Sequence, residues 1–232
     1  MKELRTSPRQ RRSQESVDAI LDAAEALIQE QGQISFTAGE LAERADMSVG
    51  RIYYWFTDID SVVTALAERL RLQLTERVAS LRLVAVDTPT PDVVHQMTNA
   101  LCDHVDLHPA TVTICFIAGE HDYGATLRTD MSGVSRQLAA MRIVDVTEEE
   151  LDVIALAVSG LQIGVLRQYL AAPQELRGKV RDELANMLIA WVSARFPLPE
   201  DPVWQQPNSA VRPARMHRDT RPLSMSRANY TR

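Results

Sequence analysis

Apolar residues recur every three or four positions along most of the chain, which is the spacing of one face of an α-helix. Few segments alternate apolar and polar residues, so the pattern gives little support for β-strands. It predicts an all-α protein with about nine helices. The expected helices cover residues 14–31, 37–45, 48–56, 60–83, 91–107, 109–121, 124–143, 148–171 and 174–195.

The segment after the first predicted helix carries unusually dense local signals. Thr37 and Glu40 have the spacing of a T-x-x-E capping box, which marks the start of a helix. Asp46 lies in the following turn, and Ser48 is a suitable N-cap for the next helix. A third start is expected immediately afterwards, at Thr57 or Asp58. These signals predict two short helices joined by a tight turn and followed by a longer helix.

Two short helices at a steep angle leave the second one exposed, so that its N-terminal residues can enter the major groove of DNA. The same geometry also occurs in ordinary packed cores, so the pattern alone favours DNA binding only modestly. The apolar stripe of helix 14–31 is expected to pack on both short helices and complete a three-helix unit.

The chain divides into four parts by composition and periodicity. The long helix expected over residues 60–83 extends well beyond the small N-terminal unit and should link it to the rest of the protein. The last segment is rich in Pro, Arg and Ser and has little to bury, so we expect it to be disordered. The predicted parts are a basic flexible arm (1–13), a helix-turn-helix domain (14–60), a larger helical body (61–196) and the Pro/Arg-rich tail (197–232).

The charge of the chain is unevenly distributed. The net charge is −6, which by itself argues against binding nucleic acid. Residues 1–12, however, carry a net +4 and residues 197–232 a net +3, which leaves −13 on the remainder. The acidic body would be repelled by DNA, whereas the basic arm could be attracted to phosphates.

Other features of the sequence predict a protein of the cytoplasm. No apolar run reaches the 18 or so residues of a membrane span, and no apolar segment follows the basic N-terminus as in a secretory signal. The two cysteines, Cys102 and Cys115, are too few for a disulfide scaffold and fit a reducing compartment.

Neither catalysis nor metal binding is expected. The chain lacks G-x-S-x-G, a phosphate-binding glycine loop and H-E-x-x-H, so we do not predict an enzyme. His104 and His108 are four residues apart, and His95, Cys102 and Asp106 are near in sequence. These residues do not form the tight Cys/His pattern of a zinc site, and we predict neither a metal nor a cofactor.

The N-terminal third of the chain resembles a known family. The segments RRSQESVDAILDAAEALIQEQG and FTAGELAERADMSVGRIYYWFTDIDSVV, within about residues 11–65, are similar to the N-terminal domain of TetR-family transcriptional regulators. The sequence departs from that pattern at Asp46, where a turn glycine is usual, at Thr57, and at Ile59, where a phosphate-binding lysine is common. The matching anchors are Gly32, Thr37, Leu41, Ala42, Ala45, Ser48, Tyr53 and Phe56.

The resemblance implies a DNA-binding role for one set of residues. Val49, Gly50 and Arg51 would face the bases, and Tyr53 and Trp55 would contact the DNA backbone, while Ile52 and Phe56 would belong to the core. Tyr54 is not assigned to either side. The full set expected at DNA is Arg11, Arg12, Thr37, Ser48, Val49, Gly50, Arg51, Tyr53 and Trp55.

The resemblance also implies partners. It predicts a homodimer, formed through the helices at about 148–171 and 174–195, on a palindromic operator in double-stranded DNA, and a small-molecule effector that releases a repressor. A helical interaction protein with a TetR-like fold that does not bind DNA specifically is the alternative. Polar residues within apolar stretches are the candidate effector contacts: His104, Thr113, Cys115, Gln162 and Tyr169.

Overall fold

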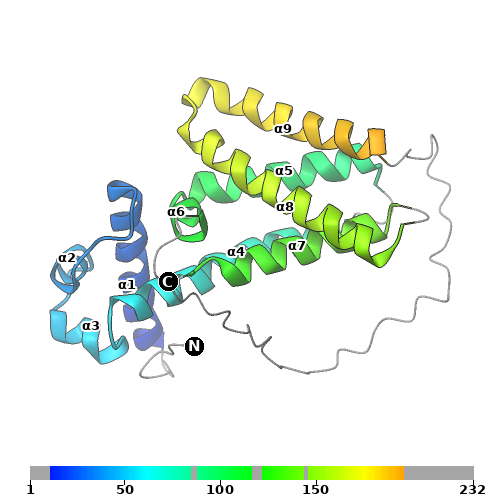
Figure 1. Cartoon of the computed structure of the whole chain (residues 1–232). Helices are drawn as coiled ribbons and strands as arrows, with labels where there is room; N and C mark the ends of the chain where they lie inside the picture. The colour runs from blue at the N-terminus through cyan, green and yellow to red at the C-terminus, as the bar shows by residue number, and fades with distance from the viewer. Residues whose placement is uncertain (1–10, 85–87, 117–121, 144–145, 196–232) are drawn as a thin grey trace, which may run out of the picture. The chain divides into compact units, whose positions relative to one another are not determined.

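The computed structural model describes residues 11–84, 88–116, 122–143 and 146–195, and these residues form nine α-helices and no strand (Figure 1). The all-α prediction is confirmed. The helices are α1 (Arg11–Gln31), α2 (Ala38–Arg44), α3 (Val49–Trp55), α4 (Ile59–Val84), α5 (Thr90–Leu107), α6 (Ala110–Phe116), α7 (Ala125–Ala140), α8 (Glu148–Ala171) and α9 (Gln174–Arg195). Helix α1 begins three residues earlier than the pattern predicts, and residues 117–121 of the expected sixth helix lie outside the described residues.

The first three helices and the start of α4 pack around one apolar core, which we call the head core. The sequence produces this core because apolar side chains fall on one stripe of α1 and face those of the short helices. Its most deeply buried members include Ile20, Leu41, Ile52, Phe56 and Val62, each at most 1% exposed. The three-helix unit predicted from the sequence is therefore present.

Two left-handed backbone positions make the turns of this unit possible. Gly32, with φ of 66°, ends α1, and its amide donates to the carbonyl of Ile28 at 2.9 Å. Asp46, with φ of 52°, forms the turn between α2 and α3. Aspartate tolerates this conformation better than most residues, which explains why the turn forms without the usual glycine.

Helix α4 connects the head core to the rest of the protein. Leu66 and Leu70 belong to the head core, whereas Leu74 and Val78, further along the same helix, belong to a second core. Asp58 Oδ1 caps the start of this helix by accepting from the Ser61 amide at 2.7 Å. Because one continuous helix enters both cores, a change of tilt in the second core can reach the head.

Helices α5 to α9 form the body, in which α7 packs along α8 and α5 along α9 (Figure 1). The body core includes Leu101, Cys102, Val105, Leu166 and Tyr169, all at most 5% exposed. Thr147 begins α8 with a second capping box, closed by Glu150. Helix α6 is shared, because its residues also enter the head core.

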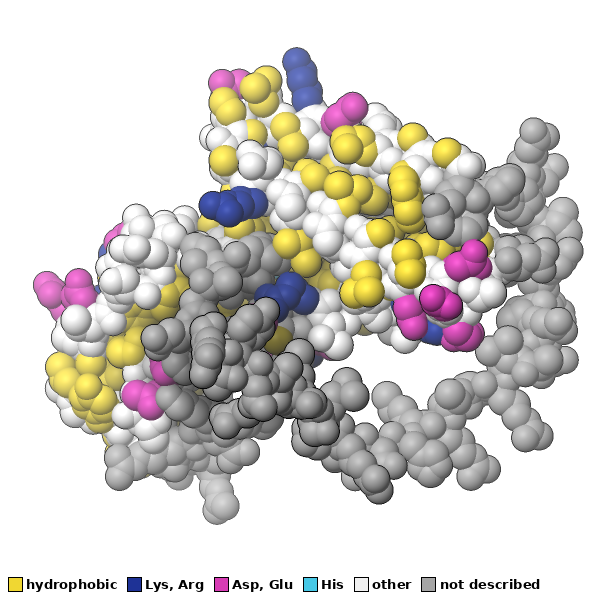
Figure 2. Space-filling model, in the orientation of Figure 1, with side chains coloured by type: hydrophobic (Ala, Val, Ile, Leu, Met, Phe, Trp, Pro, Cys, Tyr) yellow, Lys and Arg dark blue, Asp and Glu magenta, His cyan; other side chains and the backbone are white. Residues whose placement is uncertain are grey.

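Helices α8 and α9 also carry exposed apolar side chains, and Figure 2 shows apolar surface gathered over these two helices. The exposed residues include Val153, Leu156, Leu176, Met187 and Trp191, of which Leu156 is 66% exposed. By length and composition α8 could cross a membrane, and only a third of its most apolar window is buried within this chain. An apolar surface of this kind usually marks an interface.

Candidate nucleic-acid interface and internal cavity

Helix α3 is held with its first turn exposed. Ser48 caps it, and its Oγ accepts from the Arg51 amide at 3.3 Å. Ile52 and Phe56 anchor the opposite face in the head core. Val49, 41% exposed, therefore lies on the outside of the molecule at the N-terminal end of the helix.

Gly50 follows Val49 on this exposed turn. A Cβ added at Gly50 would meet only Ser48 Oγ, at an ordinary 3.9 Å, and the backbone there is helical. Neither packing nor backbone conformation within the chain therefore requires glycine at this position. A glycine on an exposed turn lets a partner approach the backbone closely.

Arg51 is held in place by its own neighbours. Its Nη2 donates to Ser16 Oγ of α1 at 3.0 Å. Its guanidinium also lies 5.9 Å from the ring centroid of Tyr54 and 6.0 Å from that of Trp55, within the range of cation–π attraction. All three partners are neutral groups, and the side chain lies at the exposed surface.

The three consecutive aromatic residues divide differently from the assignment made by resemblance. Tyr53 and Tyr54 are 44% and 53% exposed, whereas Trp55 is 3% exposed and packs in the head core. Trp55 is therefore not on the surface where a contact to the DNA backbone was predicted. Its position follows from helical spacing, because Ile52, Trp55 and Phe56 fall at i, i+3 and i+4 on one face. Tyr54, which the sequence left unassigned, takes the exposed position instead.

Thr37 lies at the start of α2, where the predicted capping box is present. Its Oγ accepts from the Glu40 amide at 3.2 Å, and its own amide donates to Glu40 Oε2 at 2.7 Å. These hydrogen bonds to Thr37 lower the pKa of Glu40. Arg11 and Arg12 are the first residues of α1, and their side chains lie outside the described residues.

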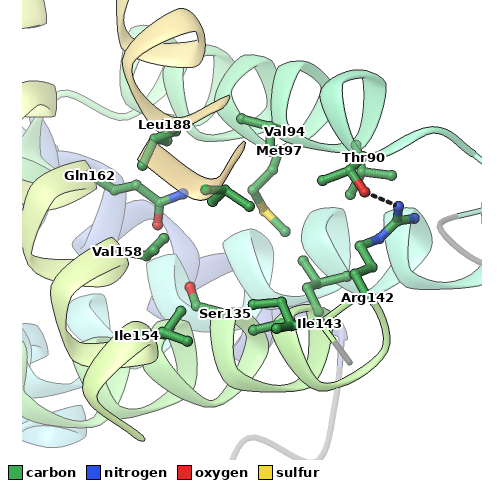
Figure 3. A pocket seen from close by; sticks show the side chains of 14 residues that line it. Thr90, Val94, Met97, Ser135, Arg142, Ile143, Ile154, Val158, Gln162 and Leu188 are labelled. Carbon is green, nitrogen blue, oxygen red and sulfur yellow. Dashed lines mark hydrogen bonds between the residues drawn. The ribbon is translucent and has the colours of Figure 1, made fainter. Parts of the chain in front are cut away.

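A second feature is an apolar cavity of about 90 Å³ inside the body (Figure 3). Helices α5, α7, α8 and α9 all contribute to its walls, together with the segment that follows α7. Arg142 lies at one end, where it donates to Thr90 Oγ1 at 2.8 Å and to the Thr88 carbonyl at 2.9 Å. Its apolar lining includes Val93, Val94, Met97, Ile154, Val158 and Leu188.

Of the five residues predicted to contact an effector, Gln162 is the one placed in this cavity. It is 5% exposed, and its Oε1 has no hydrogen-bond partner among the residues that the structure describes. Thr113 does not line the cavity, and Cys115 lies in α6 with its side chain outside the described residues. The sequence identified Gln162 as a polar residue within an apolar stretch but did not predict the residues around it.

Tyr169 and His104 are buried elsewhere and have partners within the chain. The Tyr169 hydroxyl donates to Asp106 Oδ2 at 2.5 Å and accepts from Arg181 Nη2 at 2.9 Å. His104 Nε2 lies 3.2 Å from Thr111 Oγ1. Burial, assisted by repulsion from neighbouring cationic groups, lowers the pKa of His104 to about 4, so the ring is neutral at pH 7.

One carboxylate joins the head to the body. Glu25 of α1 accepts from Arg69 of α4 at 2.9 Å, and its other oxygen lies 2.8 Å from His108 Nδ1 at the end of α5. The side chain of Glu25 is only 13% exposed. Within the described ranges, no cluster of three or more His, Cys, Asp or Glu residues has the arrangement of a metal site.

Comparison with known proteins finds a family match for the N-terminal part of the chain. Residues 20–66 match the family model described as "Bacterial regulatory proteins, tetR family". This segment contains α2 and α3, together with most of α1 and the beginning of α4. Among curated proteins, no sequence is significantly similar to the chain.

Solved structures extend the similarity to the fold of nearly the whole described chain. A TetR-family transcriptional regulator from Streptomyces coelicolor superposes with a TM-score of 0.60 at 18% identity, covering 77% of this chain and 98% of that one. SmeT, the repressor of the Stenotrophomonas maltophilia multidrug efflux pump SmeDEF, gives a TM-score of 0.58 at 18% identity, covering 79% and 91%. A complex of SmeT with triclosan gives 0.57 at 18% identity, covering 78% and 91%.

Proposed function

The chain carries the N-terminal domain of the TetR family of bacterial regulatory proteins on the fold of TetR-family regulators, and we propose that it is a homodimeric transcriptional repressor. In this proposal the head of each protomer reads one half of a palindromic operator. Two heads are needed because one helix-turn-helix contacts only a few base pairs. The proposal comprises DNA recognition, dimerisation and release by a small molecule, each supported by different residues.

The exposed first turn of α3 is the observation that carries the proposal. Val49 and Gly50 present an apolar side chain and an accessible backbone, and Arg51 adds a positive charge beside them. Val49 can meet a thymine methyl group, and Arg51 can donate to guanine or to a phosphate. Because Ser16 and the aromatic rings hold Arg51 through neutral contacts, it can be released to DNA without breaking an ion pair within the described ranges.

Phosphate contacts would surround this turn. Tyr53 and Tyr54 expose their rings beside Arg51, and Thr37 caps α2 nearby in the helix-turn-helix. Ile59 is half-buried against the head core and brings no charge to the position where the family commonly has lysine. We therefore propose that the tyrosines, with Arg11 and Arg12 at the start of α1, supply much of the phosphate binding.

Dimerisation is supported by the apolar faces of α8 and α9. Leu156, Val153 and Met187 are each about half exposed or more in the single chain, which is unfavourable for large apolar side chains in water. Pairing these helices with their copies would bury this surface and place two heads on one DNA molecule. It would also account for the membrane-like composition of α8 in a protein that we propose to be cytoplasmic.

The cavity in the body is the proposed effector site. It is lined by α5, α7, α8 and α9, and α7 also contacts α4, which runs into the head core. An effector that enlarges the cavity would shift these helices and change the separation of the two heads. The structure of SmeT with triclosan, a protein of similar fold, gives a precedent for a small molecule bound to this fold.

A salt titration of DNA binding tests the proposal. Fluorescence anisotropy would follow the full-length protein on labelled DNA flanking its own gene and on scrambled DNA of equal length. We expect specific binding whose affinity falls steeply with salt, since phosphate contacts release counterions. An absence of binding at 50 mM salt, with the protein folded, would reject DNA recognition and favour the interaction-protein alternative.

A further inference from the structure

We infer that the effector is a small, single-ring compound of the phenol type, whose hydroxyl donates to Gln162 while its ring fills the apolar cavity. This inference rests on the proposed function for its regulatory meaning, but the binding step can be tested separately. It draws on the unmet acceptor of Gln162, on the chemistry of the walls and on the size of the space.

Gln162 determines which polar group the ligand must carry. Its side chain extends from α8 into the cavity (Figure 3). The carboxamide is buried, and Oε1 has no hydrogen-bond partner within the described part of the chain. A buried acceptor without a donor is costly, so a ligand that brings an O–H or N–H to this atom gains binding energy.

The lining residues of the cavity determine that the rest of the ligand must be apolar. Val94 and Met97 of α5, Ile154 and Val158 of α8 and Leu188 of α9 surround the space between Gln162 and Arg142 (Figure 3). Burial also lowers the pKa of the Arg142 guanidinium at the other end of the cavity. A ligand must therefore be mostly apolar, with its donor placed at the α8 side.

The volume of the cavity suits a ligand of about one ring. A cavity of about 150 Å³ lined by aliphatic and aromatic residues can hold benzene. The present space of about 90 Å³ is smaller, so a ring would enter with a modest displacement of its walls. Met97 points into the middle of the cavity and has three flexible side-chain torsions, so it can make this room.

A phenol combines these properties better than an aliphatic alcohol or a carboxylic acid. Its ring is flat and rigid, so little conformational entropy is lost on binding. Its hydroxyl is a good donor to a carboxamide oxygen and remains uncharged at pH 7. A carboxylate would instead carry a full charge into an apolar space, which is costly unless it pairs with a cation such as Arg142.

A buried water is the competing partner for Gln162. A second space of about 20 Å³, also lined by Gln162 together with Leu74 and Leu166, is large enough for one water molecule. If that water satisfies Oε1, a ligand in the larger cavity gains nothing from its hydroxyl. The affinity ratio of two ligands that differ only in the donor separates these possibilities.

The experiment uses p-cresol, its methyl ether 4-methylanisole, and 4-methylbenzoate as probes of the full-length protein by isothermal titration calorimetry. The ether keeps the ring and removes the donor. We expect p-cresol to bind about five- to tenfold more tightly than the ether, which is the effect of one hydrogen bond to a buried acceptor. Equal affinity of these two probes, or binding of neither, would overturn the inference.

Substitutions of two glutamines test whether Gln162 is the acceptor of the ligand hydroxyl. Gln162→Leu removes the acceptor at similar volume, so it should bring the two affinities together while leaving the melting temperature equal or higher. Gln137→Leu, on the exposed face of α7, is the matched control and should keep the ratio. An undiminished ratio in Gln162→Leu would contradict the role of this residue. If 4-methylbenzoate binds tightly, and with the same affinity to wild type and to Gln162→Leu, the site belongs to an anion held by Arg142.

Val158→Phe provides a second test of the location, because the larger ring should occupy the cavity and weaken both neutral probes at least tenfold. If this variant does not fold, Val158→Met fills part of the space with a flexible side chain. Unchanged binding in a folded cavity-filling variant would place the ligand elsewhere.

Release of DNA by p-cresol is measured separately. A ligand that binds without releasing DNA would reject the regulatory proposal and leave the ligand assignment standing.

Discussion

The head and the body are both helical, yet they use apolar residues in different ways. In the head, apolar side chains such as Ile52 and Phe56 are fully buried, and the exposed turn of α3 combines a small apolar side chain, a glycine and an arginine. In the body, α8 and α9 bury one apolar face and expose another, which includes Leu156 and Met187. The head core is thus closed by its own helices together with α6, whereas the body leaves an apolar face exposed, which we propose that a second copy covers.

This difference has a mechanistic consequence. Because Ile52 and Phe56 anchor α3 in the head core, the head can keep the exposed first turn of α3 constant while the body changes shape. Helix α4 and the contacts of Glu25 with Arg69 and His108 are the connections through which such a change can reach the head. Substitutions in the two regions should therefore have separable effects on DNA affinity, on dimer formation and on the free energy of unfolding.

The largest effect is expected from disrupting the apolar face of the body. Leu156→Glu combined with Met187→Glu puts charges where we propose that two protomers meet, so the protein should become monomeric and lose at least a hundredfold in affinity for a palindromic site. Light scattering after gel filtration should then give the mass of one chain, 26.0 kDa.

Leu107→Glu is the control for that variant, because Leu107 is 63% exposed at the end of α5, close to the 66% of Leu156. It should leave both the mass and the DNA affinity unchanged. A double variant on α8 and α9 that remains dimeric would show that protomers associate through another surface.

The next effect concerns the head alone. Arg51→Ala should weaken specific DNA binding about tenfold or more, because a base-contacting arginine contributes about 1–3 kcal/mol and each dimer has two. Anisotropy titrations at constant salt measure the loss. Arg136→Ala removes an arginine that pairs with Glu148 and Asp152 in the body, and it should have no such effect. Equal losses in the two variants would indicate that only net charge matters.

Acid should destabilise the protein through the body. The pKa of His104 is about 4 in the folded state and about 6.5 when unfolded, so below pH 6.5 the unfolded chain binds a proton that the folded chain does not. The free energy of unfolding should fall by about 1.4 kcal/mol per pH unit between about 6.5 and 4 through this residue. Urea unfolding at pH 7.5, 6.5 and 5.5 checks it.

His104→Gln is the comparison for that titration, since glutamine can still bond to Thr111 but does not titrate in this range. Its stability should depend less on pH over the same interval. An identical pH dependence in the variant would assign the acid sensitivity to other groups.

The smallest effect separates structure from recognition by means of two matched caps. Thr37 in the head and Thr147 in the body each close a capping box with a glutamate three residues later. Replacing either by alanine should cost about 1 kcal/mol of stability. Only Thr37→Ala should also weaken DNA binding, by a few-fold, if this threonine also reaches a phosphate. A loss confined to stability in both variants would make Thr37 a helix cap only.

The sequence was most informative where local chemistry decides the structure. Thr37, Ser48 and Asp46 specify caps and a turn within a few residues, so these features could be predicted and were found. Trp55 shows the opposite case. The resemblance assigned it to the DNA backbone, whereas the structure buries it in the head core, on the same helical face as Ile52 and Phe56.

The cavity and the contacts between head and body could not be predicted in the same way. Gln162, Met97 and Arg142 come together from three parts of the chain, and periodicity shows only which face of each helix is buried. The contact between Glu25 and His108 Nδ1 joins residues 83 positions apart. Such contacts depend on how helices pack, which is a tertiary property that the pattern along one helix does not contain.

Selection of DNA from a random pool tests the central claim most directly. The full-length protein would be used to enrich binding sequences, with the Arg51→Ala variant selected in parallel. The account predicts a palindrome whose half-sites are spaced for two heads of one dimer, and a loss of sequence preference at the base pairs that face Arg51 in the variant. Failure to enrich any sequence with wild-type protein, or enrichment of the same sequence by the variant, would contradict the claim that the first turn of α3 reads DNA.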